Sequence, residues 1–239
     1  EQLLNDIRNE LFTFAKETIG LADSVTHDEL FDQTQNFIEP KNLNEFRVNI
    51  IQKLAAWKEL RPTIYFLAKK YLDIIVGNEI AMQRSVNLSI QLPDDSSSLL
   101  PLHSDVWSGN SPYEIVCWLP LVSCYKSKSM YVLPYAKSQK VFKYFSRYSK
   151  MNAEEIYQQI RPDVVELDVP FGHGVIFSHS ILHGNRVNLE SETRWTFNVR
   201  FKSLLSPYGT KELGETFLPI SIKPLTRIGY EYVMPSMGN

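Results

Sequence analysis

The sequence predicts a mixed fold in which helices pack outside a mainly β core. Apolar residues recur at helical spacing over the first 80 residues, and short strand-like runs divided by Pro, Gly and Ser follow from about residue 83. A doubly wound parallel sheet would need a helix between most strands, and residues 84–135 contain no helical pattern. The strands are therefore expected to form a sandwich or barrel.

The first 80 residues are expected to form the helical layer. In "EQLLNDIRNELFTFAKETIG" apolar residues recur every three or four positions, and Gly20 supplies a stop. Thr26 and Glu29 form a capping box in "THDELF". A third helix is expected over residues 42–58, and a fourth in "RPTIYFLAKKYLDIIVG", where Gly77 suits a C-terminal cap.

Residues 81–239 are expected to form the β core, with a helical insertion at about 137–160, "KSQKVFKYFSRYSKMNAEEIYQQI". No repeat, low-complexity tract or linker divides the chain, so one domain over residues 1–239 is expected. The expected strands are "VNLSIQL", "YEIVCWLPLV", "SMYVLP", "VVELDVP", "GVIFSHSILHG" and "TRWTFNVRFKSLL".

Composition argues against several classes of partner. The 25 Lys and Arg nearly balance the 27 Asp and Glu, so no global field attracts a nucleic acid or an anionic membrane. No apolar run reaches the length of about 18 residues that a membrane span needs. Cys117 and Cys124 are too few for a disulfide framework, and reduced thiols in a cytoplasmic protein are favoured over a bridge between them. A small-molecule substrate is the expected partner, and the oligomeric state stays open.

The stretch "PLHSDVWSGN" places His103 and Asp105 two residues apart. By itself this pair is as consistent with an ordinary polar loop as with a metal site. More polar groups follow in "GVIFSHSILHGNRVNLESETRWTFNVRF", which we expect to form a hairpin of two strands. In its second strand Arg194 and Arg200 share a face with Thr196 and Asn198, because strand side chains alternate. That face carries no acid, so an anionic ligand is expected to meet it.

A loop centred near Leu189 would set His183 opposite Arg194 across this hairpin. His179 competes with His183 as a metal ligand, but strand residues four apart are separated by about 13 Å, so only one can bind a shared ion. We choose His183, because Gly184 follows it and marks a strand end that a ligand can approach. His179 is then expected to be a core residue or a neighbour of the ligands.

Two histidines and one carboxylate leave three open positions on one face of a metal, which is the arrangement of non-heme Fe(II) oxygenases. We therefore expect His103, Asp105 and His183 to bind Fe(II). A dicarboxylate such as 2-oxoglutarate could chelate that iron and form a salt bridge with Arg194 through its distal carboxylate, with O2 as the second co-substrate. Arg200 stays open as the alternative partner. Gln91, on the polar face of "VNLSIQL", is assigned to the co-substrate site.

The motifs "LHSD", "CWLPL", "YVLP" and "GVIFSHSILHG", followed by an arginine, resemble the phytanoyl-CoA dioxygenase-like group of Fe(II)/2-oxoglutarate oxygenases over about residues 84–202. The resemblance implies a double-stranded β-helix, a jelly-roll and cupin-like fold. It assigns iron to His103, Asp105 and His183, and 2-oxoglutarate to the arginine eleven residues after the last of these, Arg194. It also implies that Trp118 lines the 2-oxoglutarate pocket, although a core aromatic explains this residue equally well.

Other features narrow the chemistry that the resemblance implies. Asn185 replaces a frequent serine and could bind a carboxylate. Related halogenases lack the carboxylate that Asp105 supplies, so hydroxylation is favoured. Some members occur in bacterial carbohydrate-biosynthesis clusters, which points to a small polar substrate such as a sugar derivative. Trp107, Asn110 and Tyr113 are candidates for the substrate face.

Two alternatives remain: a cupin-like metal-dependent isomerase or epimerase, and a non-catalytic jelly-roll binding protein. His173, between two glycines, is expected to be a turn residue, and His27 to start a helix. The C-terminal stretch "KPLTRIGYEYVMPSMGN" is assigned no role. Because the chain begins at Glu1 rather than Met, the removal of a signal segment remains an open alternative.

Overall fold

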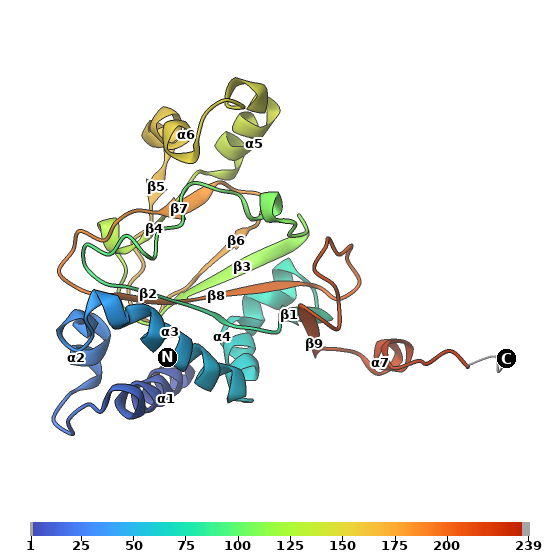
Figure 1. Cartoon of the computed structure of the whole chain (residues 1–239). Helices are drawn as coiled ribbons and strands as arrows, with labels where there is room; N and C mark the ends of the chain where they lie inside the picture. The colour runs from blue at the N-terminus through green and yellow to red at the C-terminus, as the bar shows by residue number, and fades with distance from the viewer. Residues whose placement is uncertain (1, 236–239) are drawn as a thin grey trace.

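A computed structural model describes residues 2–235, in which a layer of helices covers a set of antiparallel strands (Figure 1). The helices are α1 (Gln2–Ile19), α2 (His27–Asp32), α3 (Leu43–Ala56), α4 (Leu60–Ile75), α5 (Tyr135–Lys143), α6 (Ala153–Ile160) and α7 (Pro224–Tyr230). The strands are β1 (Ile80–Gln83), β2 (Asn87–Gln91), β3 (Glu114–Pro120), β4 (Met130–Val132), β5 (Val165–Glu166), β6 (Val175–Ser178), β7 (His183–Asn185), β8 (Arg194–Ser203) and β9 (Phe217–Ser221).

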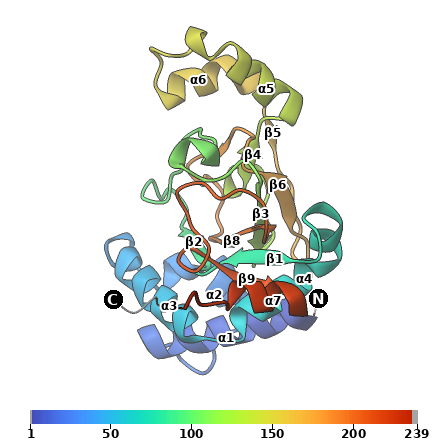
Figure 2. The same ribbon diagram turned by 90° about the vertical axis from the view of Figure 1, so that its right-hand side faces the viewer.

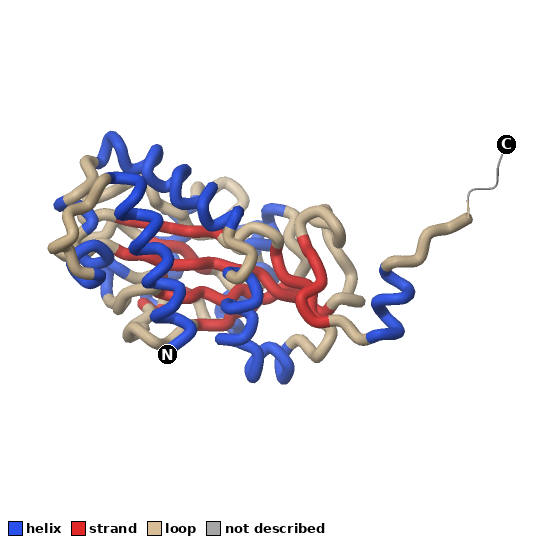
Figure 3. Tube along the Cα trace, turned by 90° about the horizontal axis from the view of Figure 1, so that it is seen from below, coloured by secondary structure: helices blue, strands red, loops and turns tan. Residues whose placement is uncertain are grey.

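The helical layer follows the apolar spacing of the sequence. The helix α1 buries one side chain per turn, and the capping box of Thr26 and Glu29 at the start of α2 is confirmed in both directions. Gly77 follows the end of α4 and adopts a φ of 113°, which a residue with a side chain rarely adopts. Seen from below, α1 and its neighbours cross over the strands (Figure 3). The buried residues of α1 are Leu4, Ile7, Leu11 and Ala15.

The longest strand, β8, organises a six-stranded antiparallel sheet. One edge of β8 pairs with β3, and the other pairs first with β2 and then with β1, whose far edge carries β9. The apolar face of β8 turns toward the helices, where Trp195 contacts the rings of Phe31 and Phe46 and donates a hydrogen bond to Thr34. The expected alternation of the two faces of β8 is therefore confirmed.

A second, three-stranded sheet has the order β5-β4-β7 and lies above β2 and β8 in Figures 1 and 2. The predicted hairpin between "GVIFSHSILHG" and the arginine strand is wrong. The first stretch makes two strands, because the Ser178 hydroxyl accepts a hydrogen bond from the Ser180 backbone and turns the chain there. The strand β6 joins the large sheet, whereas β7 pairs with β4 in the small one, so His183 does not pair with Arg194.

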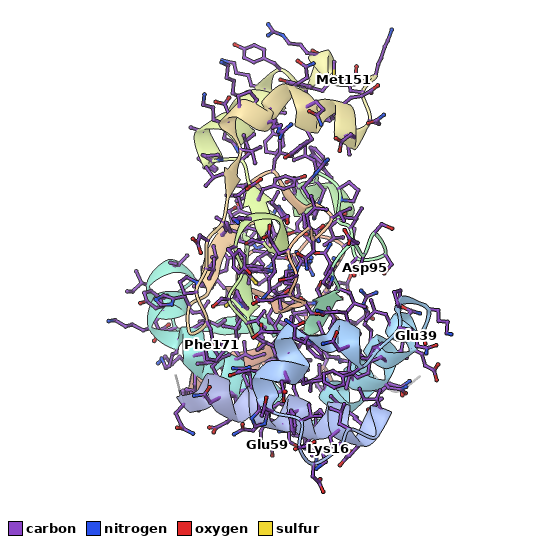
Figure 4. All side chains as sticks on the ribbon, turned by 90° about the vertical axis from the view of Figure 1, so that its left-hand side faces the viewer. Lys16, Glu39, Glu59, Asp95, Met151 and Phe171 are labelled. Carbon is purple, nitrogen blue, oxygen red and sulfur yellow. The ribbon has the colours of Figure 1, made fainter. Side chains whose placement is uncertain are left out.

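The insertion packs on the small sheet, at the end of the molecule opposite the helical layer (Figure 2). Its helices α5 and α6 bury Val141, Ile156 and Ile160 in a cluster with Tyr131 and Leu182. In Figure 4, Met151 marks the tip of the insertion, and Glu59 and Lys16 lie in the helical layer at the other end.

Four elements fall outside the sequence-based expectation. The short strands β1 and β9 were not predicted, and the expected strand in "VVELDVP" is reduced to the two residues of β5. The C-terminal stretch forms α7, which extends away from the sheets (Figure 1). None of the helices within residues 2–235 is long and apolar enough to span a membrane.

The packing of β7 against its neighbours leaves no room for a side chain at Gly184. A Cβ atom there would lie 2.5 Å from the hydroxyl of Tyr131 and 2.7 Å from the backbone oxygen of Leu100. Gly184 also lines the pocket, as expected for a strand end that a ligand can approach. We predict that Gly184→Ala lowers the free energy of unfolding by about 1–3 kcal/mol, as overpacking does, in a denaturant titration.

Gly229→Ala is the matched control, because no atom lies within 4 Å of the added methyl group and the residue sits in a helix. This variant is expected to unfold at the wild-type denaturant concentration or slightly above. Equal stabilities of the two variants would contradict the packing around β7.

Candidate metal centre

A pocket of about 710 Å³ opens between the two sheets. Its walls come from the polar faces of β2 and β8, from β7, and from the loop that connects β2 to β3. Of the residues predicted for the site, it brings together the following: His103, Asp105, Asn110, Trp118, His183, Asn185, Arg194 and Arg200.

His103 and His183 face each other through their backbones. Each accepts a hydrogen bond from the other's N–H, at 3.0 and 2.9 Å, as a closely spaced antiparallel pair does. The two imidazole rings consequently lie side by side, with their centroids 4.3 Å apart. This bridge extends the small sheet by one residue and joins two parts of the chain that are 80 positions apart in sequence.

Asp105 reaches the same point from the first turn of a 3-10 helix, Asp105–Ser108. Its Oδ1 accepts a hydrogen bond from Arg200 at 3.0 Å, and its Oδ2 lies 3.7 Å from Nε2 of His183. Burial raises the pKa of Asp105, but His179, Arg200 and His183 together hold it below the usual aspartate value. The carboxylate is therefore ionised and aims one oxygen at the histidines.

One ligand atom from each of His103, Asp105 and His183 lies within 4.8 Å of the others. The Nδ1 atoms of the histidines face the backbone oxygens of Pro101 at 2.8 Å and Ile181 at 3.1 Å. A carbonyl only accepts, so each Nδ1 carries the proton and each Nε2 keeps its lone pair for an ion. Burial, followed by the neighbouring His103, lowers the pKa of His183 to about 4, so this imidazole is neutral.

His179 lies directly behind the cluster, which confirms the expectation of a buried residue that neighbours the ligands. Its Nε2 is 3.7 Å from Oδ2 of Asp105, and its Nδ1 is 3.3 Å from Glu114, which is itself buried. The turn after β6 folds His179 and His183 to the same carboxylate, so the 13 Å separation assumed for an extended strand does not apply. Among the described residues, the three-residue cluster contains His183 and not His179.

Arg194 and Arg200 differ in their partners. The guanidinium of Arg200 is engaged by Asp105, whereas Arg194 forms no salt bridge within the described part of the chain. Arg194 is 3% exposed and makes only long contacts, to Ser129 and Ser89, while its Nε has no partner. Burial lowers the pKa of Arg194 to about 10, which leaves it charged at neutral pH. A buried, uncompensated cation is costly, and an anion in the pocket would relieve this cost.

The other three residues assigned to the co-substrate site differ in their position relative to the pocket. Trp118 lines the pocket from β3. Asn185 also lines the pocket, but its side-chain amide donates to the backbone oxygen of Ser98 and accepts from the backbone N–H of Leu100. Its amide is therefore engaged by that loop. Gln91 is fully buried outside the pocket lining, and its side chain donates to backbone oxygens of Asp95 and Arg186. Sequence alternation placed Gln91 correctly on the face of Ser89, but the end of β2 lies beyond the pocket.

Of the three residues expected at the substrate face, Asn110 lines the pocket and the other two do not. Trp107 packs against Phe142 and Phe145 of the insertion, and Tyr113 is 60% exposed. Two cationic residues that were not expected at the site also line the pocket: Arg47 from α3 and Lys211 from the loop after β8. Neither stands in a periodic pattern that could have revealed it.

His27 and His173, which were not expected to belong to the site, lie outside the pocket. His27 begins α2 and packs against the ring of Phe12, with the two ring centroids 4.1 Å apart. His173 is exposed between Gly172 and Gly174.

The sequence matches no family model, and no curated protein matches it significantly. Solved structures of similar fold include apo ThoJ, a non-heme monooxygenase, with 13% identity and a TM-score of 0.55, covering 93% of this chain and 76% of ThoJ. The ThoJ–nickel complex gives 14% identity and a TM-score of 0.53 over the same shares. HygX from Streptomyces hygroscopicus, with nickel, 2-oxoglutarate and hygromycin B bound, shares 12% identity over 66% of this chain and 67% of HygX, with a TM-score of 0.46. The likeness to ThoJ shows a common fold.

The two buried histidines predict how stability depends on pH. Burial lowers the pKa of His179 to about 3 and that of His183 to about 4, from an ordinary value of 6.5. The unfolded chain therefore binds protons below pH 6.5 that the folded protein excludes, so the free energy of unfolding falls as the pH drops from 6.5 toward 4. Each histidine contributes a slope of up to about 1.4 kcal/mol per pH unit.

Urea titrations of metal-free protein across this pH range measure the slope. His179→Gln and His183→Gln should each flatten it, whereas His173→Gln, at an exposed position, should leave it unchanged. Identical slopes in wild type and in both buried-site variants would contradict this account of the site.

Proposed function

We propose that this protein is an Fe(II)- and 2-oxoglutarate-dependent oxygenase that hydroxylates a small polar molecule. The observation that carries the proposal is the convergence of His103, Asp105 and His183 in one pocket with Arg194. The first three residues offer two imidazoles whose Nδ1 atoms face backbone oxygens and an ionised carboxylate, and the fourth offers a buried cation that forms no salt bridge with any described residue.

The donor set fits Fe(II). Two histidines and one carboxylate on adjacent positions leave the opposite face of the ion open. The backbone oxygens of Pro101 and Ile181 orient the two rings, and Arg200 orients the carboxylate. When bound, iron with 2-oxoglutarate and O2 supplies oxidising chemistry that protein side chains lack. The protein contributes the orientation of the ligands and a pocket closed by two sheets.

Arg194 supports 2-oxoglutarate as the co-substrate. A guanidinium binds a carboxylate through two parallel hydrogen bonds, and burial would strengthen this contact with the distal carboxylate of 2-oxoglutarate. Ser89 on the facing strand and Trp118 on β3 would complete this end of the pocket. A cupin-like isomerase needs the metal ligands but not this arginine, and a non-catalytic binding protein needs neither.

Several observations support the finer parts of the proposal. The two sheets are consistent with a double-stranded β-helix, and the similar fold of ThoJ, a non-heme monooxygenase, supports oxygenase chemistry. The motifs around His103 and His183 favour the phytanoyl-CoA dioxygenase-like group. Asp105 occupies the coordination position that a halide would need, which favours hydroxylation. Polar residues such as Asn87, Asn198 and Ser108 in the lining suit a substrate rich in hydroxyl groups, such as a sugar derivative.

Two substitutions separate metal binding from co-substrate binding. Asp105→Ala should abolish Mn(II) binding in calorimetry, because it removes the only anionic ligand of the cluster. Arg194→Met should keep Mn(II) binding and weaken 2-oxoglutarate binding by at least about thirtyfold, since truncating one partner of a buried charge pair costs about 2–5 kcal/mol. Succinate release with Fe(II) and O2 should be lost in both variants.

The matched control is Arg186→Met, which removes an arginine that pairs with Glu154 on the insertion and does not line the pocket. This variant should bind both ligands as the wild type does. Unchanged 2-oxoglutarate affinity in Arg194→Met would refute the assignment of Arg194 and transfer the role to Arg200.

A further inference from the structure

The charges in the pocket do not balance. Among the described residues of its lining, four cationic side chains face a single carboxylate, that of Asp105. Two of the four are compensated, because Arg47 pairs with Asp95 at 2.9 Å and Arg200 pairs with Asp105. Asp95 is labelled in Figure 4. The other two cations are Arg194 and Lys211.

The ligands of the proposed function do not remove this imbalance. A divalent metal and doubly charged 2-oxoglutarate cancel each other, so the loaded pocket keeps the two positive charges of Arg194 and Lys211. Arg194 would be satisfied by the distal carboxylate of 2-oxoglutarate. Lys211 forms no salt bridge with any described residue of the chain, and the carboxylates of Glu114 and Asp105 act on it only from beyond salt-bridge distance.

Lys211 lies on the side of the pocket that carries Asp105, because its partner Asn110 donates a hydrogen bond to the backbone oxygen of Asp105. Burial, followed by the guanidinium of Arg200, lowers the pKa of Lys211, and the carboxylates of Glu114 and Asp105 oppose this shift. Arg194 and Arg200 are six residues apart on β8, which corresponds to about 20 Å along a strand. One small dicarboxylate held by Arg194 therefore cannot also neutralise Lys211.

The ammonium group of Lys211 is held in place by Asn110. Its Nζ donates to Oδ1 of Asn110 at 2.6 Å, while Nδ2 of Asn110 donates to the backbone oxygen of Asp105 at 2.9 Å. The carbonyl accepts only, so the orientation of the amide is settled and its oxygen faces Lys211. An ammonium carries three donors, and Asn110 takes one of them. The lysine is thereby connected to the backbone of the metal-ligating residue.

The loop of residues 109–111 packs closely against the loop of residues 207–211 around this contact. A Cβ atom at Gly209 would lie 2.7 Å from the backbone oxygen of Gly109, and one at Gly109 would lie 2.6 Å from the hydroxyl of Thr210. Ser111 donates to the backbone oxygen of Pro207 at 2.8 Å. The backbones thus approach as closely as glycine allows, and Lys211 projects into the pocket from a fixed support rather than from a free loop.

We propose that Lys211, positioned by Asn110, binds an anionic group of the substrate, either a carboxylate or a phosphate, beside the metal centre. The substrate class is accordingly a small polar acid or phosphate ester rather than a neutral molecule. This inference rests on the proposed function, because it assigns the Arg194 end of the pocket to 2-oxoglutarate.

The test is calorimetric binding of simple anions to protein loaded with Mn(II) and 2-oxoglutarate, with inorganic phosphate and acetate as separate probes. At least one probe should bind saturably. Lys211→Met should weaken that binding by at least about tenfold, because a hydrogen bond between charged groups is lost, and Lys211→Arg should retain most of it. Lys150→Met, which alters an exposed lysine of the insertion, is the matched control and should bind as the wild type does.

Asn110→Asp provides an independent variant that keeps the lysine. The new carboxylate would pair with Lys211 internally, so probe binding should fall as it does in Lys211→Met. Whichever probe binds more tightly identifies the phosphate or carboxylate class. Absence of saturable binding to the loaded wild type would overturn the inference, as would binding that Lys211→Met leaves unchanged, which would come from the metal.

Failure of the proposed function gives a different result. In that case the wild type would not take up Mn(II) and 2-oxoglutarate at all, and this is measured before any probe is added. Loss of Mn(II) and 2-oxoglutarate uptake therefore marks failure of the proposed function, whereas normal uptake without Lys211-dependent probe binding marks failure of this inference alone.

Discussion

The backbone pairing of His103 with His183 is the contact on which the candidate site depends. Two hydrogen bonds hold segments that are distant in sequence at the spacing of a sheet, so the imidazoles meet without any need for flexible loops. The strand that carries His183 is held on its other edge by β4, against which Gly184 packs without room for a methyl group. Because backbone geometry sets the positions of the rings, the site is organised before a metal binds.

The strand β8 supplies the second constraint. Its apolar face is fixed by Trp195 and the aromatic rings of the helical layer, so its polar face has to line the pocket. The helices are therefore indirectly responsible for the burial of Arg194. Keeping an uncompensated guanidinium buried costs stability, and this cost favours binding of an anion over an empty pocket. The same reasoning applies more weakly to Lys211, which is only half-buried.

Much of this arrangement could be predicted from the sequence because it follows from local periodicity. The helices, the capping box of α2 and the two faces of β8 depend on spacing within a few residues. The break between β6 and β7 could not be predicted in this way, because apolar residues flank it on both sides and the turn depends on the hydroxyl of Ser178. For that reason the separation of His179 and His183 was overestimated. Lys211 was missed because its position depends on two loops meeting in space, which no pattern along the chain records.

The most direct test of the account is anomalous diffraction from crystals grown with Mn(II) and 2-oxoglutarate. We predict one anomalous peak within bonding distance of Nε2 of His103, Nε2 of His183 and a carboxylate oxygen of Asp105, with 2-oxoglutarate extending from the ion to Arg194. A peak bound by His179 in place of His183, or no peak between these residues, would contradict it.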